Sequence, residues 1–181
     1  MQLPQDFPVF VYHPDPVATG SVTASAAECV CCGRSRGFVY QGPVYSTADV
    51  PRGRLCPWCI ADGSAADRFD AHFTDIDAQQ QIGEEAAALI DRRTPGFSAW
   101  QQERWLVHCG DGAAFLGPAG ARELARHPMA LESLRAQLAE GRWPQDQIEH
   151  YLQALDKHGQ PTAYLFACRH CGTHLAYSDS T

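Results

Sequence analysis

The stretch CVCCGRSRGFVYQGPVYSTADVPRGRLCPWC, residues 29–59, contains the most specific chemistry in the chain. It holds two C-x2-C pairs, Cys29 with Cys32 and Cys56 with Cys59, and 23 residues separate the pairs. A C-x2-C pair in a tight turn directs both sulfurs at one point about 2.3 Å away, and a second such turn completes a tetrahedron. The spacing therefore predicts a four-thiolate zinc site made by these four cysteines.

The residues around the two pairs favour a zinc-ribbon module at about residues 27–60. Gly33 suits the positive φ that a turn of this kind needs, and Pro57 stiffens the second turn. Between the pairs, residues 37–40 and 44–46 are short β-prone runs separated by a Gly-Pro step, which predicts a hairpin.

Other interpretations of these cysteines remain open. The pairs are either coincidental or form disulfides if they do not bind zinc. Cys31 lies between the members of the first pair and is a spare thiol unless it replaces Cys29 as a ligand.

Composition sets the class of protein. The chain has 181 residues, of which 45% are hydrophobic and 19% charged, as in a globular protein. Its net charge of −7 argues against sequence-independent nucleic-acid binding and suits a basic protein partner. We find no cationic and apolar leader and no apolar run of spanning length, so we expect a cytoplasmic protein that does not enter a membrane and whose cysteines are metal thiolates.

The rest of the chain predicts an α+β protein, in which zinc-ribbon-like β-hairpins pack with about four helices. We expect it to form a single domain over residues 1–181. Residues 7–12 are a candidate edge strand between prolines. Helices are expected at residues 82–93, 118–127 and 129–141, and in a segment that begins at Pro144 and has the apolar face Ile148, Tyr151, Leu152 and Leu155.

A second cysteine-containing hairpin is expected at about residues 162–178. Its tip carries Cys168 and Cys171, which supply two thiolates. A closed zinc site needs four ligands, so we expect Cys109 as the third and one histidine, His174 or His108, as the fourth. The alternative is that this second site is degenerate and binds no metal.

Several longer motifs extend beyond these cysteines: GPVYS, LCPWCIADGSAA, RTPGFSAWQQERWLVHCGD, AFLG and AYLFACRHCGTHLAYSD. In this order they resemble the CbrC family of bacterial proteins, and the resemblance covers Cys29 to Asp179. It implies little about activity, because the family is named for a colicin tolerance protein and has no accepted enzymatic reaction. Members of the family often have a further cysteine shortly after the position of Cys109, where this chain has Gly110 to Ala114.

Three classes of function follow. The first is a zinc-stabilised, non-enzymatic binding protein with a tolerance or immunity-like role toward a basic toxin or nuclease. The second is a metal-dependent enzyme in which the second zinc keeps an open position and Asp111 or His108 serves as general base. The signature of zinc deaminases, H-x-E followed by P-C-x-x-C, is absent from the sequence.

The third class is a nucleic-acid-binding zinc ribbon. It is suggested by a local group of basic and aromatic residues: Arg34, Arg36, Arg52, Arg54, Tyr40, Tyr45 and Trp58. We favour the alternative that these arginines neutralise the thiolates by donating hydrogen bonds to sulfur.

Overall fold

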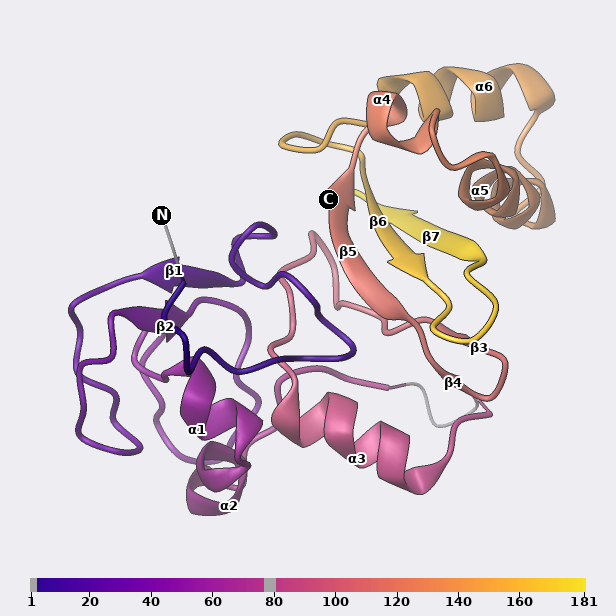
Figure 1. The fold of residues 1–181 in the computed structure, drawn as a ribbon. Helices are drawn as coiled ribbons and strands as arrows, with labels where there is room; N and C mark the ends of the chain where they lie inside the picture. Colours follow the sequence, from indigo (N-terminus) through magenta and orange to yellow (C-terminus); the bar gives the residue numbers. More distant parts are fainter. Residues whose placement is uncertain (1–2, 77–80) are drawn as a thin grey trace. The chain divides into compact units, whose positions relative to one another are not determined.

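The computed structural model describes residues 3–76 and 81–181, and these contain short antiparallel sheets and helices (Figure 1). This arrangement confirms the α+β class, although the described residues form six helices rather than about four. The elements are β1 (Val22–Ala24), β2 (Phe38–Tyr40), α1 (Pro57–Ala61), α2 (Ser64–Phe69), α3 (Glu84–Arg93), β3 (Val107–His108), β4 (Asp111–Gly112), β5 (Ala114–Ala119), α4 (Ala121–Leu124), α5 (Pro128–Glu140), α6 (Gln145–Ala154), β6 (Thr162–Ala167) and β7 (His174–Asp179).

The chain divides into two compact units. The N-terminal unit comprises Met1–Ser98 and Glu103–Trp105, and the C-terminal unit comprises Ala99–Gln102 and Leu106–Thr181. The first cysteine module therefore lies in the N-terminal unit and the cysteine hairpin in the C-terminal unit. A single domain over residues 1–181 stays a prediction.

In the N-terminal unit, β2 pairs with β1 rather than with residues 44–46 as we expected. Pro43 has no N–H to donate to a strand ladder, and its carbonyl instead accepts a hydrogen bond from the buried Tyr40 hydroxyl at 2.8 Å. The chain therefore turns away after β2, and Tyr45 forms an isolated antiparallel bridge with His72.

The helices of the N-terminal unit follow their local signals. In α3, Glu84 and Glu85 occupy the first turn and Arg92 and Arg93 the last, so both ends complement the helix dipole. Ile90 is fully buried on its inner face. The helix ends where expected, at the Thr-Pro-Gly sequence that follows it.

The predicted edge strand at residues 7–12 is wrong, because this segment has no strand pairing. Pro8 within it lacks the N–H that a strand ladder requires. Phe10 and Tyr12 are nevertheless buried, at 3% and 4% exposure, while Val9 between them is 88% exposed. The segment therefore contributes side chains to the core without strand hydrogen bonds.

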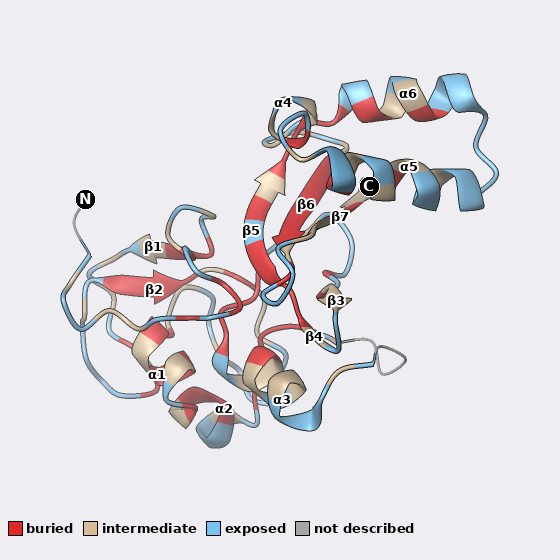
Figure 2. Cartoon of the chain, turned by 45° about the vertical axis from the view of Figure 1, so that its right-hand side comes forward, coloured by how far each residue is buried: buried red, intermediate tan, exposed pale blue. Residues whose placement is uncertain are grey.

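The C-terminal unit is built on the antiparallel sheet β5-β6-β7. All but the last residue of the central strand β6 is buried, as Figure 2 shows, and this explains its continuous apolar sequence. Residue Gly117 has φ +124 at an irregularity in β5, and Pro118 then lies on this edge strand. We expected a helix from Pro118, but the strand continues to Ala119 and leaves only the short α4.

The helices α5 and α6 cover this unit with one apolar face each. Leu134 of α5 and Ile148 and Leu152 of α6 are buried in the same apolar cluster as Leu165 of β6. Pro128 begins α5 as its first residue, a position where its missing N–H has no cost.

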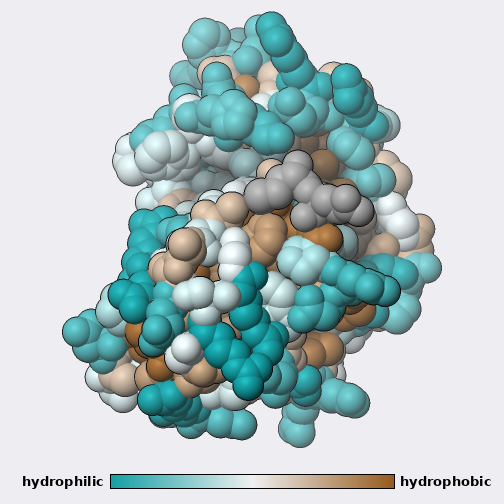
Figure 3. Space-filling view, turned by 60° about the vertical axis from the view of Figure 1, so that its left-hand side comes forward, coloured by the Kyte–Doolittle hydropathy of each residue, from teal (hydrophilic) through white to brown (hydrophobic). Residues whose placement is uncertain are grey.

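No helix in residues 3–76 and 81–181 combines the length and apolar character needed to cross a membrane. On the face shown in Figure 3, hydrophobic residues are interspersed with hydrophilic ones.

Candidate metal centres

The eight cysteines are free, and the structure gathers seven of them into two clusters of metal-ligating side chains. The N-terminal cluster is Cys29, Cys32, Cys56 and Cys59, and the C-terminal cluster is His108, Cys109, Cys168 and Cys171. In each cluster all four ligand atoms lie within 4.8 Å of one another. Each cluster belongs to one unit of the chain.

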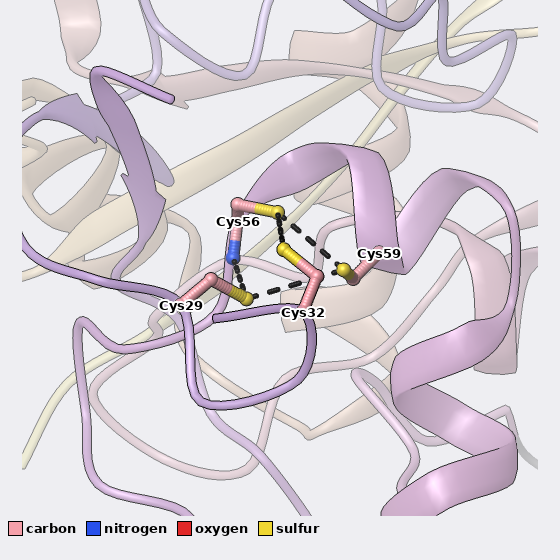
Figure 4. A group of neighbouring side chains, drawn as sticks. All are labelled: Cys29, Cys32, Cys56 and Cys59. Carbon is pink, nitrogen blue, oxygen red and sulfur yellow. Dashed lines mark hydrogen bonds between the residues drawn. The ribbon is translucent and has the colours of Figure 1, made fainter. Parts of the chain in front are cut away.

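The N-terminal cluster has the dimensions of a tetrahedral zinc site (Figure 4). The Sγ–Sγ distances are 4.0 Å for Cys29–Cys59, 3.9 Å for Cys32–Cys56 and 3.5 Å for Cys56–Cys59. Four sulfurs about 2.3 Å from a central ion are about 3.8 Å apart, because the tetrahedral angle fixes that edge. The donor set and its spacing therefore fit a four-thiolate metal site.

Two tight turns direct these sulfurs. In the first, the Gly33 N–H donates to the Cys29 carbonyl at 2.8 Å, and Gly33 has φ +67. In the second, Cys56 precedes α1 and Pro57 is the first helical residue. This places Cys59 within the first turn of that helix, where its N–H donates to the Cys56 carbonyl at 3.2 Å.

Burial makes the N-terminal cluster part of the apolar core. Cys29, Cys56 and Cys59 are at most 4% exposed, whereas Cys32 is exposed. A hydrogen bond from the Cys56 thiol lowers the pKa of Cys29 to about 4, while burial raises the pKa of Cys59 to about 12. Without a cation, some of the four cysteines therefore keep their thiol protons. A divalent ion is the partner that allows all four sulfurs to be thiolates.

Cys31 lies outside the cluster. Its Sγ is 3.6 Å from the Ser64 hydroxyl and the side chain is buried. The sequence left open whether Cys29 or Cys31 joins the group of four, and in the structure Cys29 is the member.

Three of the four arginines near the N-terminal cluster have partners other than sulfur. Arg52 Nε donates to the Gln41 carbonyl at 2.8 Å, and Arg54 Nε donates to the Glu28 carbonyl at 2.9 Å. The guanidinium of Arg36 lies 5.0 Å from the centre of the Trp58 ring. For Arg52 and Arg54, the expected hydrogen bonds to sulfur are therefore wrong, because these side chains bind backbone carbonyls.

The C-terminal cluster joins residues that are distant in sequence. Cys109 Sγ and Cys171 Sγ are 3.8 Å apart, and His108 Nδ1 lies 3.3 Å and 3.4 Å from them. A zinc-bound nitrogen and sulfur are about 3.5 Å apart for bonds of about 2.0 and 2.3 Å. Three thiols and one imidazole at this spacing fit a closed tetrahedral site.

Two hairpin tips supply these ligands. Residues Cys109 and Gly110 form the two-residue turn between β3 and β4, with φ +54 and +74. Such a turn requires positive φ at both positions, and the cysteine accepts a conformation that a side chain usually avoids. At the other tip, Gly172 N–H donates to the Cys168 carbonyl at 3.0 Å, and Gly172 has φ +73.

Of the two candidate histidines, His108 is the one that lies with the three cysteines. His174 lies in β7, outside the group of four, and its ring centre is 4.2 Å from that of His127. It is opposite Ala167 in the strand ladder, a register that takes it away from the hairpin tip. The geometry therefore favours His108 over His174 as the fourth ligand, and the ligand assignment stays a prediction.

Asp111 does not face the cluster as a free base. Its Oδ2 is 2.6 Å from Arg169 and 2.9 Å from His170 Nε2. The polar contacts of Asp111 thus fix the β3–β4 hairpin against the β6–β7 hairpin.

Sequence reasoning missed a buried carboxylate in the N-terminal unit, Glu103, and its contact with Tyr45. Glu103 is 4% exposed, and the Tyr45 hydroxyl donates to both of its carboxylate oxygens at 2.8 Å. Burial raises the pKa of Glu103 above its ordinary value. The two residues are 58 positions apart, so no local pattern indicates their contact.

The chain is similar to known proteins along nearly its full length. The model of an uncharacterised protein family, UPF0167, matches residues 7–180. UPF0167 proteins of Mycobacterium bovis and Mycobacterium tuberculosis are each 52% identical over 178 residues, which cover 97% of this chain and 95% of each relative. A UPF0167 protein of Pseudomonas aeruginosa is 46% identical over 169 residues, 91% of this chain and 92% of the relative. No solved structure matches. The chain belongs to the UPF0167 family.

Proposed function

We propose that this protein binds two zinc ions, one at each cluster, and that both ions are structural. One observation carries the proposal: the four sulfurs of the N-terminal cluster lie in a mostly buried site at the edge lengths of a zinc tetrahedron. Thiolate and imidazole donors in tetrahedral sets are typical of zinc, and four protein ligands leave no position for water.

The two ions stabilise different connections. At the N-terminal cluster, an ion joins two turns that contribute directly to the apolar core. At the C-terminal cluster, it joins the β3–β4 tip to the β6–β7 tip, where Cys109 and Cys171 are exposed. Structural zinc contributes about 10–16 kcal/mol of apparent binding free energy in small zinc modules, so its loss is expected to unfold the local structure.

The ligand geometry favours a binding protein over a metal-dependent enzyme. His108, one of the two candidate bases, is itself a ligand in the proposed site. Asp111, the other, is held by Arg169 and His170. An enzyme using this zinc needs one of the four ligands to leave during the reaction.

For the partner, we propose a basic protein, in line with the net charge of −7. A shallow groove of about 520 Å³ runs along α6 and is lined by Trp143, Asp146, Gln147, His150, Tyr151 and Ala154. Trp143 is 43% exposed and packs edge-on against Tyr151, with ring centres 5.4 Å apart. An exposed aromatic ring, here that of Trp143, beside a carboxylate suits an arginine or lysine side chain.

The resemblance to the CbrC family suggests a class of basic partner, a nuclease toxin of the colicin type. In this proposal the protein is a cytoplasmic tolerance or immunity-like factor that binds such a toxin. Support comes from the resemblance, the charge and the groove on α6.

Metal content tests the central proposal. Elemental analysis of protein purified without added metal is expected to give two zincs per chain. One zinc would leave the C-terminal cluster as a metal-free thiol group, and iron in place of zinc would overturn the assignment of the metal.

Calorimetric titration with a purified basic nuclease domain tests the partner. We expect binding that weakens as salt rises, and at least a tenfold loss with Trp143→Ala or Asp146→Asn. Met129→Ala is the control, because this α5 side chain is 56% exposed and is not part of the groove lining. Binding that is equally strong in all three variants would remove the groove from the proposal.

A further inference from the structure

The two clusters differ in how far solvent reaches their sulfurs. In the N-terminal cluster, Cys29, Cys56 and Cys59 are 0%, 1% and 4% exposed. In the C-terminal cluster, Cys109 and Cys171 are both exposed. A dissolved oxidant therefore reaches two sulfurs of the second cluster.

These two exposed sulfurs are also neighbours, 3.8 Å apart. The exposed sulfur of the N-terminal cluster, Cys32, differs in this respect. Its neighbour at 3.9 Å is the buried Cys56. The C-terminal cluster thus presents a solvent-facing pair of thiols, and the N-terminal cluster does not.

The backbone at both sulfurs consists of tight turns rather than long strands. Cys109 is at the tip of the β3–β4 hairpin, and Cys171 precedes Gly172 at the β6–β7 tip. A disulfide has an S–S length of about 2.05 Å, so the sulfurs must approach by about 2 Å. Rotation of two exposed side chains on hairpin tips supplies a movement of this size.

We propose that Cys109 and Cys171 are a site of oxidation by peroxides, at which disulfide formation releases the ion of the C-terminal cluster. The inference rests on the proposed function, which places zinc there. The N-terminal cluster keeps its ion under the same conditions, because three of its four cysteines are buried and the exposed Cys32 has no exposed thiol beside it.

The chemistry is a two-electron oxidation of the two thiolates by one hydroperoxide. One thiolate attacks a peroxide oxygen, the O–O bond breaks, and a sulfenic acid and hydroxide form. The second thiolate attacks the sulfenic sulfur, an S–S bond forms and a second hydroxide leaves. Two protons from solvent convert both hydroxides to water, so hydrogen peroxide and two thiolates give one disulfide and two waters.

The two remaining ligands are too few to hold the ion. Cys168 is 4% exposed, so a dissolved oxidant does not reach its sulfur. Together with His108 it offers two donors, whereas a structural zinc site requires four.

The experiment uses the full chain as purified, after its metal content has been measured. Hydrogen peroxide is added in small excess, zinc release is followed with a chromogenic chelator, and cysteine links are mapped by mass spectrometry of a non-reduced digest. Cys31→Ser is the control variant, because Cys31 lies outside both clusters. We expect about one zinc released per chain, a Cys109–Cys171 link, and recovery of the ion after a dithiol reductant and zinc are added.

Three results would overturn the inference: no zinc release in excess peroxide, release from the N-terminal cluster first, or a link between other cysteines. The inference and the proposed function can fail separately. A chain without zinc at the C-terminal cluster refutes the proposed function at that cluster, while the digest of the same oxidised protein still decides whether Cys109 and Cys171 pair. Loss of one zinc from Cys31→Ser to the same extent as from the wild type excludes Cys31 as the oxidised residue.

Discussion

The backbone N–H of Cys56 donates a hydrogen bond to the Sγ of Cys29 over 3.2 Å, although 27 positions separate the two residues. The bond links the first cysteine turn to the start of the second, and both atoms are buried. Hydrogen bonds to a sulfur stabilise its thiolate and orient it toward a metal. The two turns are thus held together by the protein as well as by any ion between them.

Cys56→Ser should remove the zinc of the N-terminal cluster and unfold this part of the core. A serine hydroxyl is a poor zinc ligand, and a structural zinc accounts for about 10–16 kcal/mol of apparent binding free energy. We expect an insoluble protein or one with a single zinc per chain by elemental analysis. Cys31→Ser, the matched control, should retain both ions. A folded Cys56→Ser variant with two zincs would contradict the structural role of this cluster.

The two histidines that the sequence left as alternatives give a direct test of the C-terminal cluster. His108→Ala should lower the zinc content from two to one per chain, because Nδ1 of His108 lies 3.3 Å and 3.4 Å from two of the sulfurs. His174→Ala removes only the ring packed against His127 and should keep both ions. The opposite result, with zinc lost from His174→Ala alone, would reverse the assignment.

Buried His13 predicts a dependence of stability on pH. Its Nδ1–H donates to the Pro95 carbonyl at 2.6 Å, and Nε2 is 2.7 Å from the Thr19 hydroxyl. Burial lowers the pKa of His13 from 6.5 to about 4. Between these values the unfolded chain binds more protons than the folded one, so the free energy of unfolding falls as the pH falls.

The size of this effect follows from the two pKa values. A difference of about 2.5 pKa units corresponds to a decrease of roughly 3 kcal/mol in the free energy of unfolding between pH 6.5 and pH 4. His13→Gln keeps the hydrogen-bonding groups without the titration and should show a shallower slope in denaturant unfolding over this range. Because zinc release at low pH affects both proteins alike, the difference between their slopes is the measurement. Identical slopes would exclude His13 as the cause.

The carboxylate of Glu103 predicts a pH dependence of stability opposite in sign to that of His13. Burial raises the pKa of Glu103, so the folded state holds its proton more tightly than the unfolded state. The free energy of unfolding therefore decreases as pH rises through the interval between the two pKa values. Glu103→Gln preserves an acceptor for the Tyr45 hydroxyl and removes the buried charge.

We expect Glu103→Gln to be more stable than the wild type at pH 8 and to differ less from it at pH 4.5, measured by denaturant unfolding. Tyr45→Phe provides the complementary control, because it removes one hydrogen-bond donor to the buried carboxylate and should destabilise the protein by about 1–3 kcal/mol. A Glu103→Gln variant that is less stable at pH 8 would show that the charge itself stabilises the fold.

Sequence patterns predicted the elements whose signals are local. The apolar stripe and flanking charges placed α3 and its end at Arg93, and the apolar run placed β6. The cysteine spacing grouped Cys29, Cys32, Cys56 and Cys59 correctly, because two residues between ligands is a property of one turn. Pro118 misled the helix assignment, since a proline is compatible both with a helix start and with an edge strand.

The amino-acid sequence by itself determined the α+β class and the acidic character of the protein. It also determined the two C-x2-C turns of the N-terminal cluster and the membership of three cysteines in a second cluster. Tertiary structure alone decided that His108 rather than His174 completes that cluster, and that Tyr45 meets the buried Glu103. The physical reason is range. Turn geometry and helix periodicity depend on residues within a few positions, whereas the direction of a side chain at a hairpin tip depends on strand register and on partners 58 or more positions away.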